Sequence, residues 1–204
     1  MFDTAVRRLI DPTLDRAARR VARLGWSADA VTVVGFLIGM AGCAAIAFRL
    51  YAAGLAAILL NRLADGLDGS LARLRTTTDR GGYLDTVLDT VFYSGVPFGF
   101  AVAEPHNALP AAFLIYSFVG TGGSFLAYAA LSAKRGITSD PERRKSFYYS
   151  VGLMEGTETV LFFVLFCLWP AHFATLAWIF GGLCWITTAA RLAAGLQTFR
   201  DPMP

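Results

Sequence analysis

The chain has 204 residues, of which 55% are hydrophobic and only 16% charged, and its formal net charge is +3. A soluble domain carries about 25% charged residues, so the composition favours a membrane protein and argues against a soluble one. The small net charge gives no indication of a nucleic-acid partner. Cys43, Cys167 and Cys184 all lie in apolar runs, where small packing residues are expected rather than a disulfide framework.

The first 26 residues have the pattern of a basic amphipathic helix. Apolar residues recur at helical spacing from Val6 to Leu24 with arginines between them, and the segment lacks the pattern of a signal peptide. We expect Pro12 to break or restart this helix. Such a segment is typical of a helix lying on an anionic lipid surface. The predicted organisation is therefore an interfacial helix, residues 1–26, followed by a membrane domain, residues 27–204.

Six apolar windows follow, each close to the roughly 20 residues that a membrane-spanning helix needs. They cover residues 30–50, 52–74, 82–103, 109–131, 147–169 and 173–196. The expected fold class is all-α, a polytopic membrane protein with six transmembrane helices. If the N-terminus is cytoplasmic, the cytoplasmic segments and the window ends that adjoin them hold every Lys and Arg except Arg49 and Arg62. Because basic residues mark the cytoplasmic side, both termini are predicted to be cytoplasmic.

The second and third windows contain acids that a membrane helix normally avoids. Asp65 and Asp68 are three residues apart, and Asp85 and Asp89 are four apart, so each pair shares a helix face. A short link joins the two helices, so both pairs are expected to face each other near the cytoplasmic end. Four carboxylates there repel one another, and a divalent cation removes the conflict. Oxygen-only ligands favour Mg²⁺, Mn²⁺ or Ca²⁺.

Two other interpretations of these acids stay open. Arg62, Arg73 and Arg80 could neutralise them as structural ion pairs, or the acids could line a path for an ion or a proton. The outer halves of the predicted helices are almost wholly apolar, which counts against a transporter.

Small residues accompany the acids on the second window. Gly66, Gly69 and Ala72 are each three residues apart and form a bare strip along one helix face. This strip would let a flat base approach closely, but it also suits ordinary helix packing.

The segment 65–89 resembles the signature of the CDP-alcohol phosphatidyltransferase family, D-x-x-D-G-x-x-A-R, a spacer, then G-x-x-x-D-x-x-x-D. Every fixed position of this signature is filled, by Asp65, Asp68, Gly69, Ala72, Arg73, Gly81, Asp85 and Asp89. The spacer before Gly81 is one residue shorter than is usual in the family, which indicates a shorter cytoplasmic turn. The predicted helices also resemble the family's six spans and interfacial helix.

The resemblance implies metal-dependent transfer of a phosphatidyl group from CDP-diacylglycerol to a small alcohol, with release of CMP. Asp65, Asp68 and Asp85 would be metal ligands, while Asp89 would contact a second ion and act as the general base. The implied cofactors are two divalent ions, Mg²⁺ or Mn²⁺. Chemistry agrees, because a pyrophosphate donor needs a metal to neutralise its leaving group. With both histidines in the outward links, a carboxylate is the available base.

The resemblance also implies contacts to the CDP moiety, from Gly69, Ala72, Arg73, Gly81 and Thr32. Thr32 belongs to the segment SADAVTVVG, which is similar to the family's P-N-x-x-T opening, with Asp29 where Asn is frequent. Ser27 in the same segment is predicted to cap the first membrane helix.

The basic link between the fourth and fifth windows bears on the acceptor. It contains Arg143, Arg144 and Lys145, which suit a phosphate-bearing acceptor such as glycerol 3-phosphate. Positive charge in this place is also explained by membrane topology and attraction to anionic lipid.

An acidic pair points to a different acceptor. Glu155 and Glu158 are three residues apart inside the apolar fifth window. They could hydrogen-bond acceptor hydroxyls, hold a cationic amino alcohol, or pair with Arg191 or Arg62. The sequence therefore does not choose among glycerol 3-phosphate, an inositol-type alcohol and an amino alcohol as the acceptor.

Three expectations concern the whole chain. The motif also allows a reversed reaction, in which a soluble CDP-alcohol passes its head group to diacylglycerol, but the basic helix and small size favour a CDP-diacylglycerol donor in a bacterial inner membrane. The resemblance suggests a homodimer. Small residues are available for close helix contact at Gly95, Gly99, Gly120, Gly122 and Gly123.

Overall fold

The computed structural model describes residues 3–137 and 154–200, and these residues form helices joined by short links. The α-helices are α1 Asp3–Arg23, α2 Ala28–Ala47, α3 Tyr51–Leu74, α4 Asp79–Ala103, α5 Ala108–Lys134, α7 Gly156–Leu168 and α8 Phe173–Thr198. The short 3₁₀ helices η1 Pro105–Asn107 and η3 Pro170–His172 precede α5 and α8. The predicted all-α class is confirmed.

Helix boundaries agree with the predicted windows to within one turn for α2, α3, α4, α5 and α8. Hydroxyl caps explain two of the starts. The Ser27 Oγ accepts a hydrogen bond of 3.1 Å from the backbone N–H of Ala30, as predicted, and Thr78 Oγ1 does the same for Gly81. The fifth window differs, because α7 begins only at Gly156. Residues 147–153 of that window lie outside the described part.

Four helical stretches among the described residues are long and apolar enough to cross a membrane: α2, α4, η1 with α5, and η3 with α8. At 24 residues, α3 is also long enough, about 36 Å at 1.5 Å per residue. Its charged side chains, among them Arg62, Asp65 and Asp68, make it less apolar. The described part of α7 is a shorter apolar helix of 13 residues.

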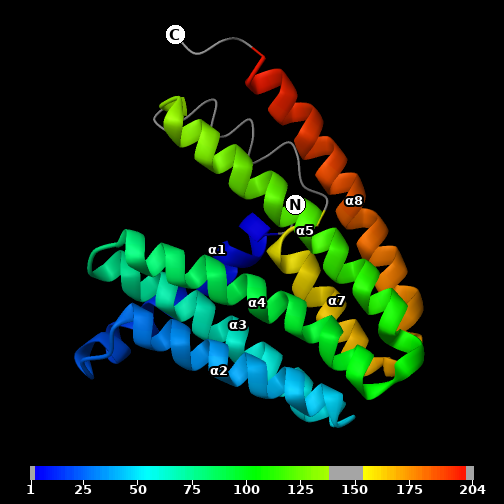
Figure 1. Cartoon of the computed structure of the whole chain (residues 1–204). Coiled ribbons are helices and arrows are strands. Elements are labelled where there is room, and N and C mark those ends of the chain that lie inside the picture. The colour runs from blue at the N-terminus through cyan, green and yellow to red at the C-terminus, as the bar shows by residue number, and fades with distance from the viewer. Residues whose placement is uncertain (1–2, 138–153, 201–204) are drawn as a thin grey trace.

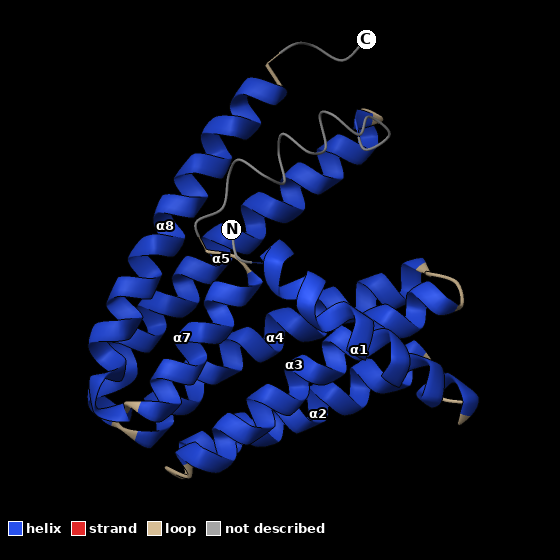
Figure 2. Cartoon of the chain, turned by 180° about the vertical axis from the view of Figure 1, so that it is seen from behind, coloured by secondary structure: helices blue, strands red, loops and turns tan. Residues whose placement is uncertain are grey.

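The helices form two groups that converge at one end (Figures 1 and 2). Helices α2, α3 and α4 lie together, α5 pairs with α8, and α7 contacts both groups. Phenylalanines fill the convergent end. Phe100 stacks on Phe173 with ring centroids 4.4 Å apart, and Phe166 packs edge-on against both. This apolar core is joined to a polar site toward the other end of α3 and α4.

Close packing of α2 against α3 and α4 depends on glycine. A Cβ at Gly42 would lie 2.8 Å from the Ala57 Cβ, and a Cβ at Gly99 would lie 2.7 Å from the carbonyl oxygen of Cys43. Small residues allow helix backbones to approach in this way. Nearer the beginning of α2, a Cβ at Gly35 would lie 2.7 Å from the Ala64 Cβ, so this part of α2 is held against α3 beside the acids.

The glycines considered for a dimer fall into two sets. A Cβ at Gly95, Gly99 or Gly120 would meet atoms of neighbouring helices within 3.1 Å, so these three pack inside the chain. A Cβ at Gly122 or Gly123 would have no described neighbour within 4 Å. Close contact with another subunit therefore stays an expectation for Gly122 and Gly123 alone.

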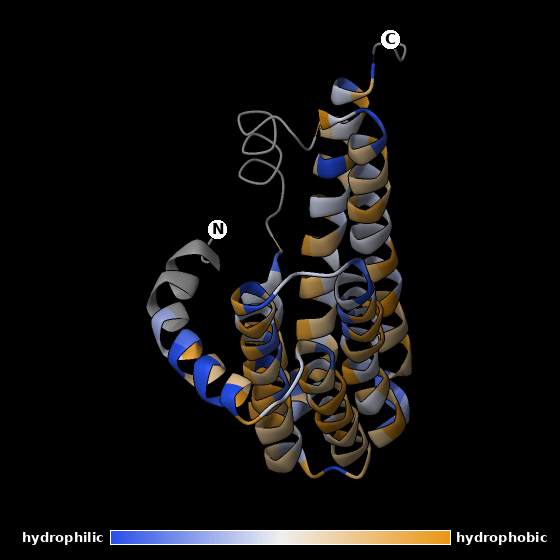
Figure 3. Cartoon of the chain, turned by 90° about the vertical axis from the view of Figure 1, so that its left-hand side faces the viewer, coloured by the Kyte–Doolittle hydropathy of each residue, from blue (hydrophilic) through white to orange (hydrophobic). Residues whose placement is uncertain are grey.

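Helix α1 packs beside the bundle rather than within it. Ala18 is fully buried against Val31 of α2 and Leu71 of α3. The Arg75 side chain donates a 3.2 Å hydrogen bond to the carbonyl oxygen of Ala22 near the end of α1. In Figure 3 the coloured turns of α1 are mostly hydrophilic and those of the adjoining bundle mostly hydrophobic. This arrangement is that of an amphipathic helix with one packed face.

The expectation that Pro12 breaks this helix is wrong. Helix α1 runs without interruption from Asp3 to Arg23, with Pro12 inside it. A proline removes one backbone hydrogen bond, but Pro12 is exposed, so its ring does not clash with a packed neighbouring helix. The Arg16 Nε also donates to the carbonyl oxygen of Pro12 at 3.0 Å.

Candidate active site

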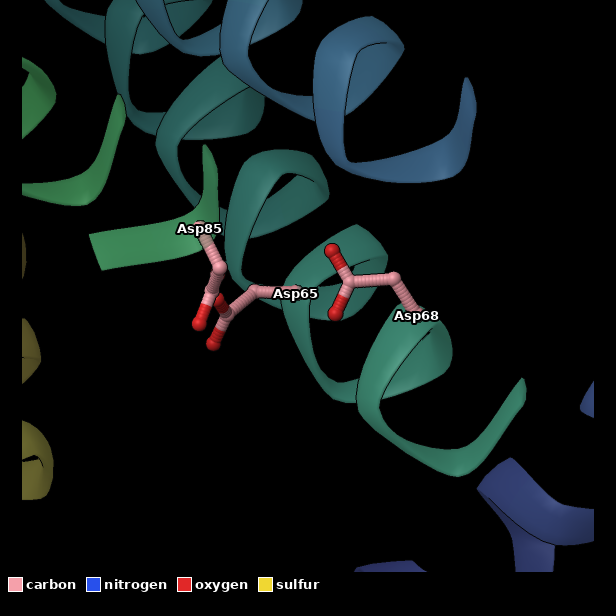
Figure 4. Close-up of side chains that lie close together, drawn as sticks. All are labelled: Asp65, Asp68 and Asp85. Atoms are coloured by element: carbon pink, nitrogen blue, oxygen red, sulfur yellow. The ribbon is translucent and has the colours of Figure 1, made fainter. Parts of the chain in front are cut away.

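Three carboxylates from α3 and α4 converge. Asp65, Asp68 and Asp85 each offer an oxygen atom, and these oxygens all lie within 4.8 Å of one another. Figure 4 shows the carboxylates of Asp65 and Asp85 close together, with that of Asp68 turned toward them. The two helices are antiparallel across the short 75–78 link, which brings the end of α3 beside the beginning of α4. The predicted meeting of the two acidic pairs is therefore observed.

These acids line a cleft with about 240 Å³ of empty space, open solvent included. Its walls come from the first half of α2, the second half of α3 and the first half of α4. The lining residues are Thr32, Gly35, Phe36, Asn61, Arg62, Asp65, Asp68, Asp85, Leu88 and Asp89. All four aspartates of the signature thus share one cleft with Thr32.

A hydroxyl group on α2 orients one of the carboxylates. The Thr32 Oγ1 lies 2.6 Å from Asp68 Oδ2 and 3.0 Å from the carbonyl oxygen of Ala28. The shorter contact is a hydrogen bond to a charged acceptor, which is stronger than one between neutral groups. Asp68 is only 6% exposed, so this bond restricts which way its carboxylate can turn.

Asp89 is paired with a guanidinium group. Arg62 Nη2 lies 2.6 Å from Asp89 Oδ1, and Arg62 Nη1 lies 3.3 Å from Asp89 Oδ2, so both carboxylate oxygens are engaged. The same Nη1 lies 3.5 Å from Asp65 Oδ2. The Arg62 side chain is 12% exposed. The structural ion pairing considered for Arg62 therefore occurs, and it occurs inside the cleft.

Asn61 connects this arginine to α2. Its Nδ2 donates to the carbonyl oxygen of Gly35 at 2.8 Å, and its Oδ1 accepts from Arg62 Nε at 2.8 Å. The side chain of Asn61 is buried, so both bonds replace water that the amide loses.

The remaining signature residues lie outside the lining of the cleft. Gly69, Ala72 and Arg73 continue α3 toward its C-terminus, and the exposed Arg73 donates to Ser70 Oγ at 2.9 Å. Gly81 lies in the first turn of α4, where a Cβ would be 3.2 Å from Asp29 Oδ1.

The strip of small residues on α3 divides between two environments. A Cβ at Gly66 would lie 2.8 Å from Leu14 of α1, so Gly66 serves helix packing. At Gly69 the nearest contact would be Arg73 Nη1 at 3.6 Å, so this position is more open.

The acceptor candidates are resolved only in part. Arg143, Arg144 and Lys145 lie outside the described residues. The sequence predicted that Glu155 and Glu158 both lie inside a helix. In the structure Glu155 precedes α7, and the two residues form a capping box at its start. Their side chains accept from backbone N–H groups that the first turn of a helix leaves free. For Glu158 the bond to the Glu155 N–H is 3.3 Å.

The arginines considered as partners for these glutamates have other contacts. Arg62 pairs with Asp89 and Asp65. Arg191 of α8 donates to the carbonyl oxygen of Thr121 at 3.1 Å and interacts electrostatically with Glu155.

Sequence reasoning missed Asn61, and it named Arg62 as a partner of the acids without identifying Asp89 as the carboxylate that it pairs with. A signal was present, since Arg62 is one of only four basic residues inside the predicted membrane windows. It also precedes Asp65 by three residues and so shares its helix face. Gly35, Phe36 and Leu88 carry no such signal, because ordinary apolar or small residues line a cleft only by virtue of the tertiary fold.

The residues present fit a hard divalent cation. The cluster offers oxygen atoms alone, as Mg²⁺ and Mn²⁺ prefer. Carboxylate ligands of metals are themselves usually hydrogen-bonded, and Asp68 has such a bond from Thr32. We therefore regard Asp65, Asp68 and Asp85 as the part of the cleft best suited to an ion.

Comparison with known proteins identifies the class. The family model for CDP-alcohol phosphatidyltransferase matches residues 26–190. This chain belongs to the CDP-alcohol phosphatidyltransferase family, and it is a membrane transferase of phospholipid biosynthesis. The interpretation of the acids as a path for ions or protons is thereby set aside.

Two individual relatives are similar to this chain over different lengths. The chain is 51% identical over 202 residues to the inner membrane protein YnjF of Escherichia coli strain K12, covering 98% of both. It is 38% identical over 89 residues to the archaetidylinositol phosphate synthase of Methanothermobacter thermautotrophicus, covering 43% of this chain and 42% of that one.

The fold is also that of a solved structure. The crystal structure of Mycobacterium tuberculosis phosphatidylinositol phosphate synthase (PgsA1) with CDP-DAG bound superposes with a TM-score of 0.67 at 21% identity, covering 94% of this chain and 98% of that one. A second structure of PgsA1, in complex with manganese and citrate, has the same TM-score.

Proposed function

We propose that this chain transfers a phosphatidyl group from CDP-diacylglycerol to a small alcohol in a metal-dependent reaction that releases CMP. The observation that carries the proposal is the convergence of Asp65, Asp68 and Asp85, with Asp89 in the same cleft. Membership of the family supplies the reaction class. The relative solved with CDP-DAG bound supports this donor.

Asp65, Asp68 and Asp85 would hold Mg²⁺ or Mn²⁺. A divalent ion there would offset the negative charge that develops on the CMP leaving group. The structure of PgsA1 with manganese supports an ion of this kind, since the two chains share a fold. Thr32 would keep Asp68 in the orientation that binds the ion, through the 2.6 Å hydrogen bond between them.

Asp89 is the proposed general base. The acceptor hydroxyl would give its proton to this carboxylate, and its oxygen would bond to the phosphorus that carries diacylglycerol. The bond from that phosphorus to the oxygen of CMP would break, and CMP would leave. A carboxylate base is consistent with the cleft, because its lining contains no histidine. Arg62 holds the Asp89 carboxylate in place.

The CDP moiety is proposed to lie along the C-terminal part of α3, against Gly69, Ala72 and Arg73. The open surface at Gly69 leaves room for it, and the exposed Arg73 is free to turn toward a phosphate. Gly81 would border the same space from α4. The role proposed for Thr32 is to donate its hydrogen bond to Asp68 rather than to contact CDP.

The proposed membrane arrangement has six spans, with α3 and α7 completing the four apolar stretches. Helix α1 would lie at the lipid surface, and both termini and the cleft would face the cytoplasm, as the basic residues indicate. The name of the Escherichia coli relative supports the inner membrane. A homodimer stays an expectation.

The acceptor is best sought among phosphate-bearing alcohols. Two relatives are named as synthases of inositol phosphate lipids, and the basic residues Arg143, Arg144 and Lys145 suit such an acceptor. Glu155 and Glu158 are engaged in capping α7, which weakens the argument for an amino alcohol.

The test is a panel of acceptors with purified chain in liposomes containing CDP-diacylglycerol. CMP release and the new lipid would be followed with inositol phosphate, glycerol 3-phosphate, inositol, serine, choline and ethanolamine. We expect one acceptor to give a phosphatidyl product with the wild type and none with Asp89→Asn. Release only from soluble CDP-alcohols with diacylglycerol would establish the reversed reaction instead. Absence of transfer with every pair of substrates would overturn the proposal.

A further inference from the structure

Arg62 is a fixed positive charge inside a cleft of carboxylates. It is the one Lys or Arg among the described residues that line the cleft, together with four aspartates. Its side chain is only 12% exposed. The free-energy cost of removing a guanidinium group from water must be offset by contacts with other groups. These contacts indicate the role of Arg62.

Two of these partners are carboxylates of the proposed active site. The guanidinium engages both oxygens of Asp89, at 2.6 and 3.3 Å, and its Nη1 also lies 3.5 Å from Asp65 Oδ2. The positive charge therefore lies between Asp89 and Asp65. A metal ion that bridged these two carboxylates would have to occupy the same space.

The other partners keep the guanidinium there. Its Nε donates to Asn61 Oδ1 at 2.8 Å, and Nη1 donates to the Tyr93 hydroxyl at 2.9 Å. The rings of Phe92 and Tyr93 lie 4.9 and 5.0 Å from its central carbon, within the range of cation–π attraction. Side chains from two helices therefore hold the guanidinium group in position on several sides.

Charge balance leads to the same conclusion. When ionised, the four aspartates and Arg62 leave three negative charges in the cleft. In the cleft without a bound donor, one divalent ion reduces these to a single negative charge, whereas a second would leave the cleft positive and would lie against the guanidinium. Like charges at such distances repel strongly where water is largely excluded.

We infer that Arg62 takes the place of a second metal ion at Asp89, so that the cleft binds one divalent cation, at Asp65, Asp68 and Asp85. Arg62 is thus a positioning residue for the proposed base. The role of Arg62 in positioning the base rests on the proposed function, whereas the number of ions that the cleft binds does not. This differs from the two ions that the family resemblance implies.

The chain offers a matched control in Arg49. This arginine also forms an ion pair with a carboxylate, Glu104, at 3.0 Å, and donates to the carbonyl oxygen of Ala103. It lies between α2 and α3, at the opposite end of α3 from Asp68, and its side chain is 61% exposed. Loss of its charge should leave the cleft unchanged.

The experiment counts Mn²⁺ ions bound to the full chain in lipid nanodiscs, by equilibrium binding and electron paramagnetic resonance. Wild type, Arg49→Gln and Arg62→Lys should bind one ion per chain, with the signal of an isolated Mn²⁺. Arg62→Gln should bind two, with the broadened signal of a coupled pair. The double variant Arg62→Gln/Asp89→Asn should return to one, because it removes the second site along with the arginine.

Two coupled ions in the wild type, or one ion in folded Arg62→Gln, would overturn the inference. If Arg62→Gln is not recovered folded, the wild-type count and Arg62→Met, which keeps an apolar stem between the rings, decide the matter. Transfer of the phosphatidyl group by a wild type that binds two ions would leave the proposed function intact. A wild type that binds one ion but transfers no phosphatidyl group would support the inference and contradict the proposed function.

Discussion

Thr32 shows how a single hydroxyl group can prepare a metal ligand from a neighbouring helix. Its hydrogen bond to Asp68 Oδ2 is 2.6 Å long and joins the first turns of α2 to the end of α3. Groups that orient a metal ligand in this way typically contribute a factor of about 10 to 100 in metal affinity or activity. A residue outside the acidic part of the signature can therefore matter for the ion.

We predict that Thr32→Val weakens Mn²⁺ binding by about 10- to 100-fold, because the isosteric methyl group cannot donate to Asp68. Isothermal titration of the purified chain measures the effect. Thr32→Ser is the control, since it keeps the hydroxyl and should stay within a few-fold of the wild type. Equal affinities for the valine and serine variants would contradict the assigned role.

At this scale the sequence predicted the acids and named Arg62 as a possible partner, but it did not predict which acid Arg62 contacts or the hydrogen bond from Thr32 to Asp68. Asp65, Asp68, Asp85 and Asp89 could be placed together because helical spacing and one short link determine their faces. The choice of Asp89 as the partner of Arg62 depends on side-chain conformations and on Asn61 and Tyr93, which sequence spacing does not specify.

The element that positions the site is α2, whose glycines bring it close to α3 and α4. At Gly99 of α4 the neighbour is a backbone oxygen, that of Cys43, at 2.7 Å from an added Cβ. A backbone atom cannot move aside as the end of a flexible side chain can. Gly122 of α5 offers the opposite environment, with nothing within 4 Å among the described residues.

We predict that Gly99→Ala destabilises the protein, because overpacking in a well-packed interior costs about 1–3 kcal/mol. Gly122→Ala gains the same helix propensity, about 0.5–1 kcal/mol, without the clash. Thermal denaturation in one detergent compares the two. The midpoint should fall for Gly99→Ala and should hold or rise for Gly122→Ala. An unchanged midpoint for Gly99→Ala would show that the helices are not packed this closely.

The start of α2 was predicted well because the polar cap Ser27 precedes an apolar run. The start of α7 was not, because a window average over apolar residues is insensitive to a local capping box. The side chains of Glu155 and Glu158 accept hydrogen bonds from backbone N–H groups at the start of α7. Their three-residue spacing is therefore that of a capping box.

For the whole molecule, the orientation in the membrane follows from the distribution of basic residues. Under the proposed arrangement the 75–78 link is cytoplasmic and η1 lies on the outer side. The native cysteines Cys43, Cys167 and Cys184 are free and buried, so an introduced cysteine can be labelled with little background.

We predict that His106→Cys is labelled by an impermeant maleimide in intact spheroplasts, while Thr77→Cys is labelled only after the membrane is opened. Both positions are exposed in the structure, so accessibility depends on the side of the membrane. The reverse pattern would place the acidic cleft on the outer side and would contradict a cytoplasmic site.

The bundle as a whole could be predicted from apolar windows and one signature, since both are properties of short segments. The divergence of the α5 and α8 pair from α2, α3 and α4 could not, because it arises from packing between distant segments (Figure 1).

The most direct test of the central claim is CMP release from CDP-diacylglycerol under control of a divalent ion. With the active acceptor present, we predict that EDTA stops release, that Mg²⁺ or Mn²⁺ restores it, and that Asp85→Asn lowers it at least about 100-fold, since removing one electrostatic contribution of this kind costs roughly that much. Release that continues in excess EDTA, or that survives in Asp85→Asn, would contradict a metal-dependent transferase centred on these aspartates.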